Sequence, residues 1–241
     1  PFVEAVVLAG GLVADLGTDA QRAEVLGALA EGTLLPAFAH TEVGSRWQAS
    51  ARSVTATEVG GAWQLTGVKE PVPHGARADL LVVSALVDGG TRLFLVPGDA
   101  EGLTRTGYRN HDGTRSAKVT FAGTPAQPLG PGTADQSAAI EKAQARARVA
   151  YGHEALGAME TALTTTAEYL KARKQFGVPL NKFQALTFRA ADMYVSLELA
   201  RSTVMWATLV VDADGDVVAA ADRARLQACL LYTSDAADER S

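Results

Sequence analysis

A short turn between two predicted helices carries the side chains best suited to bind a charged ligand. Arg173 lies at the C-terminal end of the first helix, where the helix dipole favours a cation. Its guanidinium could hold a phosphate group through two parallel hydrogen bonds. Phe176 adds apolar cover, and Gln175 and Gln184 add amide groups. The alternative is that Arg173 only caps the helix and Phe176 only packs the turn.

Two long amphipathic helices are predicted on either side of this turn. The first is capped by Thr133 and runs to about Lys174, which makes it roughly 60 Å long at the α-helical rise. The second carries an apolar repeat with spacings of three and four at Phe183, Leu186, Ala190, Met193, Leu197, Ala200 and Val204. We therefore expect the two helices to pack antiparallel, with a third helix beginning near Val217.

The sequence pattern of residues 1–32 predicts two further helices. Thr18 is followed three positions later by Gln21, which is the spacing of a capping box. The first helix presents a large apolar surface made by Phe2, Val3, Val6, Val7 and Leu8. Because nothing upstream covers this surface, we expect that preceding sequence is missing.

Residues 34–128 change to a period of two with frequent turn signals, which predicts an antiparallel sheet or barrel. Gly60 and Gly61 separate two alternating runs, and glycine readily adopts the positive φ of a tight hairpin. The turn at 88–90 joins a second pair of strands in the same way, and residues 116–121 add another strand.

Composition excludes several classes of protein. The chain has 241 residues, of which 47% are hydrophobic and 20% charged, as in ordinary globular proteins. A net charge of −5 argues against a nucleic-acid partner. No apolar run reaches the roughly 18 residues of a membrane span, so we expect no membrane partner and a cytoplasmic location. Four dispersed histidines and the single Cys229 predict no metal site.

The segment from Tyr169 to Gln184 resembles the flavin-contacting helix turn of the acyl-CoA dehydrogenases. Arg148 and the small-residue run 152–159 precede it at the positions that the family uses. The resemblance covers about residues 1–228 and implies an α+β fold like that of the family. This fold has a partial N-terminal helical domain (1–33), a middle antiparallel β-barrel domain (34–128) and a partial C-terminal helical bundle (133–228).

Residues 229–241 do not fit the family. They resemble the translation of a sequencing adapter, and a natural helix end is the alternative. The chain is thus expected to be a fragment truncated at both ends.

The resemblance implies that the cofactor is FAD. Arg173 matches an arginine that reaches the FAD pyrophosphate of a neighbouring subunit, and Gln175, Phe176 and Gln184 match positions around the same cofactor. At the start of the β-domain, Phe38 and Thr41 match a second contact region, where the Thr41 hydroxyl would address the edge of the flavin ring. The alternative is that this region is only the polar end of a strand, in which the Thr41 hydroxyl is hydrogen-bonded within the protein.

Two regions depart from the family pattern. Val43 replaces a proline and the following Gly-Ser-Asp turn is lost, which weakens the expected contact with the acyl-CoA. Gly67 and Lys69 match the family, but Pro71 and Pro73 stand where an aromatic residue and a threonine would lie against the flavin. Either FAD is held differently here, or this subunit has lost it.

The implied reaction is the α,β-dehydrogenation of an acyl-CoA thioester with hydride transfer to FAD, and it needs a carboxylate base. The family places this base far downstream of Gln184 or just before Arg148, and the latter position is Ala147. No catalytic residue is therefore predicted, and the fragment is expected to be inactive. Glu154 and Glu160 are interpreted as solvated or interhelical charges.

The implied partners are an acyl-CoA substrate and an electron-transfer flavoprotein, and flavin contacts between subunits imply a homo- or hetero-oligomer. The main alternative is a non-catalytic partner subunit of a heteromeric acyl-CoA dehydrogenase. An acyl-CoA oxidase or a flavin monooxygenase on the same fold is a third reading.

Overall fold

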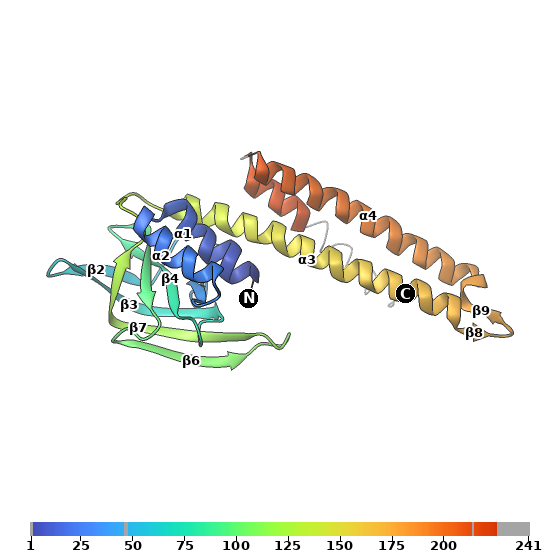
Figure 1. Cartoon of the computed structure of the whole chain (residues 1–241), viewed down its shortest axis with the longest axis horizontal. Coiled ribbons are helices and arrows are strands. Elements are labelled where there is room, and N and C mark those ends of the chain that lie inside the picture. The colour runs from blue at the N-terminus through green and yellow to red at the C-terminus, as the bar shows by residue number, and fades with distance from the viewer. Residues whose placement is uncertain (1, 46–47, 214, 226–241) are drawn as a thin grey trace. The chain divides into compact units, whose positions relative to one another are not determined.

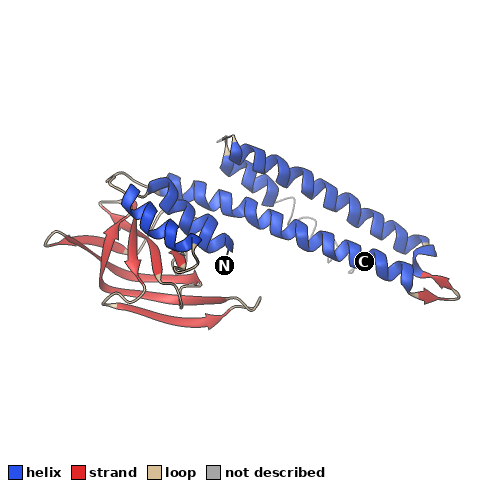
Figure 2. Cartoon of the chain, viewed as in Figure 1, coloured by secondary structure: helices blue, strands red, loops and turns tan. Residues whose placement is uncertain are grey.

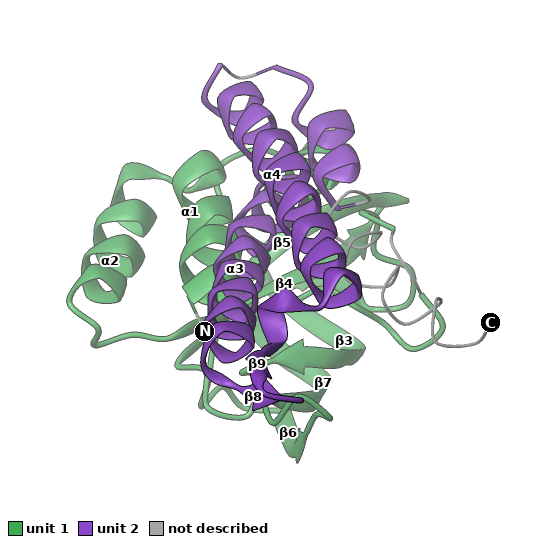
Figure 3. Cartoon of the chain, turned by 90° about the vertical axis from the view of Figure 1, so that its right-hand side faces the viewer, with its two compact units in different colours: residues 1–144 green, residues 145–241 purple. Residues whose placement is uncertain are grey.

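The computed structural model describes residues 2–45, 48–213 and 215–225 of the chain. These residues form two compact units, with the boundary between Gln144 and Ala145 (Figure 3). Each unit has its own hydrophobic core. The tail predicted to be foreign, residues 229–241, lies outside the described residues, and the predicted domain limits stay predictions.

The first unit begins with the π-helix η1 (Phe2–Gly10) and the α-helices α1 (Gly11–Leu16) and α2 (Asp19–Ala30). The predicted capping box is confirmed, because Thr18 Oγ1 accepts from Gln21 N at 3.2 Å and Gln21 Oε1 accepts from Thr18 N at 3.1 Å. The Gln21 amide also donates to Pro128 O at 2.9 Å and accepts from Gly130 N at 3.0 Å. One side chain thus starts α2 and ties it to the end of the last barrel strand.

Seven strands follow (Figure 2): β1 (Pro36–Ala39), β2 (Thr55–Val59), β3 (Ala62–Pro73), β4 (Leu80–Val87), β5 (Gly90–Pro97), β6 (Leu103–Arg109) and β7 (Arg115–Pro128). The pairs β4–β2, β2–β3, β3–β7, β7–β5 and β5–β4 close the sheet into a barrel. The predicted antiparallel barrel is confirmed, with one exception: β1 and β2 both run parallel to β4, along the same edge. The described residues 40–45 and 48–54, between β1 and β2, therefore lie near the seam of the barrel.

Both predicted hairpins are confirmed. Gly60 and Gly61 have φ of 61° and 83°, and Asp88 and Gly89 have φ of 49° and 82°. Positive φ at both loop residues is the geometry of a type I′ turn, whose twist matches that of the flanking strands.

Strand β4 is buried on both faces because two cores share it. Leu81, Val83 and Ala85 point into the barrel core, whereas Val82 packs in a second core with residues of η1, α1 and α2. The start of the next helix completes that second core through Ile140. Such double burial explains why this strand is apolar on both faces except at Ser84.

Helix α3 (Ser137–Ala172) begins at Ser137, so the prediction of a cap at Thr133 is wrong. The Asp135 carboxylate accepts from the Ser137 N–H and hydroxyl groups instead. A carboxylate at a helix start satisfies an unpaired N–H and complements the dipole.

In the second unit, α3 is followed by β8 (Lys174–Gln175), β9 (Val178–Pro179), the 3₁₀-helix η2 (Leu180–Lys182) and α4 (Gln184–Asp212). A third helical segment occupies residues 217–225. The antiparallel pairing of α3 with α4 is confirmed (Figure 1), because Val149 and Leu156 share a core with Leu197 and Val204 of the predicted seam. Among the described residues, no helix has the length and apolarity needed to cross a membrane.

Candidate functional site

A fully buried lysine, Lys69 of β3, lies at the seam of the barrel. Its ammonium group donates to His40 O at 2.9 Å, to Glu42 Oε1 at 2.7 Å and to Ser84 Oγ at 2.9 Å. These acceptors come from the segment that follows β1 and from β4. Each of the three ammonium protons therefore has an acceptor, which a buried charge requires.

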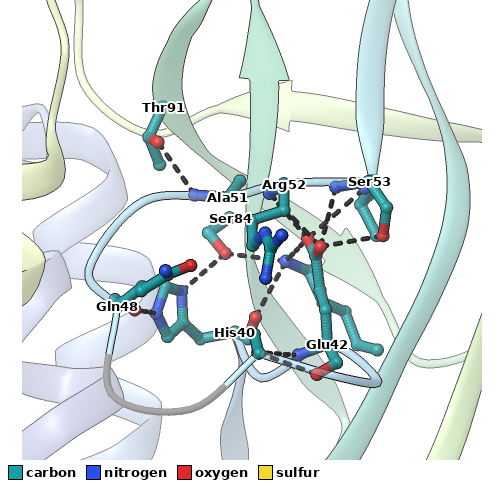
Figure 4. Close-up of polar contacts among 11 residues, drawn as sticks. His40, Glu42, Gln48, Ala51, Arg52, Ser53, Ser84 and Thr91 are labelled. Atoms are coloured by element: carbon teal, nitrogen blue, oxygen red, sulfur yellow. Dashed lines mark hydrogen bonds and ion pairs between the residues drawn. The ribbon is translucent and has the colours of Figure 1, made fainter.

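The Glu42 carboxylate is the counter-ion of Lys69 and is also buried. It accepts from Ser53 N at 2.7 Å, from Ser53 Oγ at 2.8 Å and from Arg52 N at 3.2 Å (Figure 4). Burial alone would raise the pKa of the Glu42 carboxyl, but the hydrogen bond and charge of Lys69, with these other donors, lower that pKa to about 2. Burial lowers the pKa of Lys69 to about 8, against the opposing effect of Glu42. Both groups are therefore charged at neutral pH.

The imidazole of His40 connects the segment to β4. Its Nδ1 lies 2.8 Å from Ser84 Oγ and its Nε2 lies 2.7 Å from Gln48 O, and both contacts appear in Figure 4. Burial lowers the pKa of His40, so the ring is neutral at pH 7. A carbonyl oxygen can only accept, so Nε2 carries the proton, Nδ1 accepts from the Ser84 hydroxyl, and Ser84 Oγ accepts from Lys69.

The two predicted contact residues of the β-domain have different surroundings. Phe38 is 6% exposed and stacks on His40, with ring centroids 5.1 Å apart. Thr41 is half-buried, and its carbonyl accepts from Glu70 N at 2.8 Å. No described residue forms a hydrogen bond with the Thr41 hydroxyl. Thr41 can therefore offer this group to a ligand, whereas Phe38 is part of the core.

The prolines that depart from the family pattern lie in an irregular part of β3. Pro71 and Pro73 are exposed, Val72 between them is buried, and the register with β7 shifts between Lys69 and Val72. Without N–H groups the two prolines cannot donate to a ligand from this edge.

The four site residues predicted around the helix turn gather at one end of the second unit (Figure 1). Arg173 follows the last residue of α3, Gln175 lies in β8, and Gln184 opens α4. All three are exposed, and the Arg173 guanidinium has no ion pair within the described part of the chain.

Phe176 lies at the tip of the two-residue turn between β8 and β9. It has φ of 52°, is followed by Gly177 with φ of 83°, and is 92% exposed. Its ring lies edge-on to that of Phe183, at 6.2 Å between centroids. A large aromatic residue in the left-handed region, almost wholly in solvent, is unfavourable for folding.

The two glutamates of α3 that could serve as acid–base groups, Glu154 and Glu160, do not form a catalytic cluster among the described residues. Glu160 forms an ion pair with Arg201 of α4 at 3.6 Å, which confirms an interhelical charge. Glu154 is exposed, and Ala147 is buried where the minority branch of the family has its base. Within the described residues no group of histidine, cysteine and carboxylate side chains could hold a metal ion.

Comparison with known proteins decides the family. Residues 37–123 match the model of the acyl-CoA dehydrogenase middle domain, and residues 138–239 match the model of the acyl-CoA dehydrogenase C-terminal domain. The chain belongs to the acyl-CoA dehydrogenase family. The predicted fold class is thereby confirmed, with the β-barrel in the middle domain and the antiparallel helices in the C-terminal domain.

Relatives within the acyl-CoA dehydrogenase family have modest sequence identity but closely similar structures. The short-chain specific acyl-CoA dehydrogenase of Megasphaera elsdenii is 31% identical over 213 residues, which cover 83% of this chain and 55% of that protein. The solved butyryl-CoA dehydrogenase of the same organism has a TM-score of 0.89 at 28% identity, covering 98% of this chain and 64% of the other. A steroid ACAD variant, Tcur3481-Tcur3483, has a TM-score of 0.80 at 32% identity, covering 94% of this chain and 60% of the other. The chain thus spans only about half the length of the curated relatives that it matches.

Proposed function

We propose that the chain is part of a flavin-dependent acyl-CoA dehydrogenase, which removes hydrogen from the α and β carbons of an acyl-CoA thioester. The observation that carries this proposal is the exposure of Arg173, at the end of α3, and of Phe176, in the β8–β9 turn, where the guanidinium has no ion pair among the described residues and the ring has only an edge contact with Phe183. Membership of the family supports it. The proposed partners are an electron-transfer flavoprotein, which takes the electrons, and further subunits of a homo- or hetero-oligomer.

The residues present fit FAD in chemistry and exposure. Arg173 would hold the diphosphate through its guanidinium, and the amides of Gln175 and Gln184 would supply polar contacts. Phe176 would cover an apolar part of the cofactor, and this contact would offset the cost of its strained, exposed conformation. Thr41, in the first unit, would donate its hydroxyl to the edge of a flavin ring, and the resemblance implies that Arg173 reaches the FAD of a neighbouring subunit. Bound FAD supplies the hydride acceptor of the reaction.

Removal of the α-proton needs a carboxylate with raised basicity, held in an apolar site. Glu160 is paired with Arg201, and Glu154 is in solvent. We therefore assign no base within the described residues and propose that the chain binds the cofactor without turning over substrate.

A titration of the purified chain with FAD, followed by quenching of flavin fluorescence, tests the proposal. We expect saturable binding, and an affinity that falls at least about tenfold in Arg173→Ala because a charge-assisted hydrogen-bond pair is lost. Lys174→Ala is the matched control, since it removes an adjacent exposed cation, and it should stay within about twofold. The proposal fails if the unaltered chain takes up no FAD, or if both variants weaken binding equally.

A second candidate is a non-catalytic partner subunit that has lost FAD, and the exposed Pro71 and Pro73 favour it. In that case the unaltered chain stays colourless, whereas Pro71→Trp with Pro73→Thr restores uptake by returning an aromatic surface and a hydroxyl. Uptake of FAD by the unaltered chain at micromolar concentration rejects this candidate.

A further inference from the structure

We propose that Lys69 and Glu70 form a clamp that fixes the backbone of residues 40–42 and so positions the Thr41 hydroxyl for its ligand. This inference rests on the proposed function, because the ligand concerned is FAD. Lys69 is a positioning residue here, since it acts on the site only through Thr41.

Three consecutive residues of the segment are each held by the clamp. Lys69 Nζ donates to His40 O at 2.9 Å and to Glu42 Oε1 at 2.7 Å. Between them, Glu70 N donates to Thr41 O at 2.8 Å. Thr41 is thus fixed at its own carbonyl and on both sides in sequence. The remaining freedom of the residue is rotation of its side chain.

Neighbouring polar groups in the seam are satisfied by the chain itself, whereas the Thr41 hydroxyl is not. Ser84 and Gln48 form hydrogen bonds with the two nitrogens of the His40 ring, and Ser53 donates to the second carboxylate oxygen of Glu42. Within the described residues the Thr41 hydroxyl has no hydrogen bond, and the residue is half-buried. This arrangement leaves one hydroxyl free on a fixed backbone, so that only the rotation of its side chain must be ordered when a ligand binds.

Stability alone does not explain a buried lysine at this position. Replacing a buried ion pair by apolar side chains of similar volume is often neutral or stabilising, because both charges must leave water. Apolar residues would, however, supply no directed hydrogen bonds to His40 O and Glu42. We infer that the pair is kept for the geometry that it imposes on Thr41.

A double-mutant cycle with FAD affinity as its readout tests the clamp. Thr41→Ala is made in the unaltered chain and in Lys69→Met with Glu42→Gln, a background that removes the two Lys69 bonds of the clamp without leaving an unpaired charge. We expect Thr41→Ala to weaken FAD binding by about fivefold to tenfold in the first case and by less than about twofold in the second. Gln21→Leu, a buried change remote in sequence from this segment, is the control background and should keep the full effect.

Equal effects of Thr41→Ala in all backgrounds, or no effect in the unaltered chain, would overturn the clamp and leave the proposed function standing. If the unaltered chain takes up no FAD, the proposed function and the clamp fail together. A flavin-independent arm measures amide hydrogen exchange at residues 41–45, which should accelerate at least about tenfold in the background without the Lys69 bonds, and unchanged exchange also overturns the clamp. If circular dichroism shows that this background does not fold, Lys69→Met alone replaces it, since it removes both Lys69 bonds to the segment while Glu42 keeps its bonds from Arg52 and Ser53, and the same criteria apply.

Discussion

The Lys69 cluster at the barrel seam and the β8–β9 turn both carry a cation, but they treat it in opposite ways. Lys69 is fully buried and has three acceptors, all from its own chain. Arg173 is exposed without an ion pair among the described residues, and Phe176 beside it is 92% in solvent. The difference is between a cation whose hydrogen bonds are all made within the described chain and a cation that is left exposed, which we propose binds a ligand. Lys69 is buried with full hydrogen bonding, whereas Arg173 is exposed near the strained backbone of Phe176.

The largest effect should follow from breaking the buried pair. Glu42→Ala leaves the Lys69 charge buried without a counter-ion and is expected to cost about 3 to 5 kcal/mol of unfolding free energy. Urea unfolding followed by circular dichroism measures the loss. Glu58→Ala, at an exposed position of β2, is the control and should change stability by less than about 0.5 kcal/mol. A loss in Glu42→Ala that is no larger than in the control would remove the contrast between the two regions.

Acid should weaken the buried pair in a defined pH range. The folded-state pKa of Glu42 is about 2, below its ordinary value, so its contribution is complete above about pH 4.5 and is lost as the pH falls toward 2. The stability difference between the unaltered chain and Glu42→Gln should shrink across this range by roughly 3 kcal/mol. Unfolding curves at several pH values test the sign, and a difference that grows on acidification would contradict it.

The strained turn should respond in the opposite direction. Phe176→Asn places in the left-handed position a residue that tolerates it, next to Gly177, so stability should rise by about 1 kcal/mol or less. The same change should reduce FAD uptake if Phe176 covers the cofactor. Thermal unfolding and flavin titration measure the two effects, and a variant that is less stable would show that Phe176 supports the fold.

The smallest effect on folding is expected at Arg173. Arg173→Ala should change the unfolding free energy by less than about 0.5 kcal/mol, because the guanidinium is exposed and unpaired within the described chain. Its expected loss of FAD affinity thus comes without a loss of stability. A substantial destabilisation would mean that Arg173 belongs with Lys69 as a residue of the fold.

Local signals allowed much of the fold to be predicted. The capping box at Thr18, the glycine turns and the heptad seam of α4 depend on residues close in sequence, and all are found in the structure. The start of α3 was predicted wrongly because two suitable caps lie close together, and only the fold shows that Asp135 reaches Ser137. The parallel pairing of β1 and β2 with β4 depends on chain closure, which a period of two does not reveal.

The candidate site divides in the same way. Arg173 and Phe176 form a contiguous motif, so the sequence predicted them as a set. The cluster at the seam joins His40 and Glu42 to Lys69 and Ser84, which are far apart in sequence, and three strands must be placed before their contacts exist. The sequence signal for this cluster is that Lys69 shares the inward-facing side of β3 with apolar residues. A buried lysine needs an acidic partner, which this signal does not identify.

The closure of the barrel has a consequence for solubility. Strand β2 meets β4 through the single registered pair Thr55 and Leu86, with one further bond from Leu86 N to Val54 O at 2.8 Å, whereas β3 and β7 pair along most of their length. A closed sheet has no strand edge with unpaired N–H and C=O groups. Thermal motion that separates β2 from β4 would expose such an edge on β4, which is an apolar strand. Self-association of the chain on heating should therefore start with β4 recruiting a strand from another molecule.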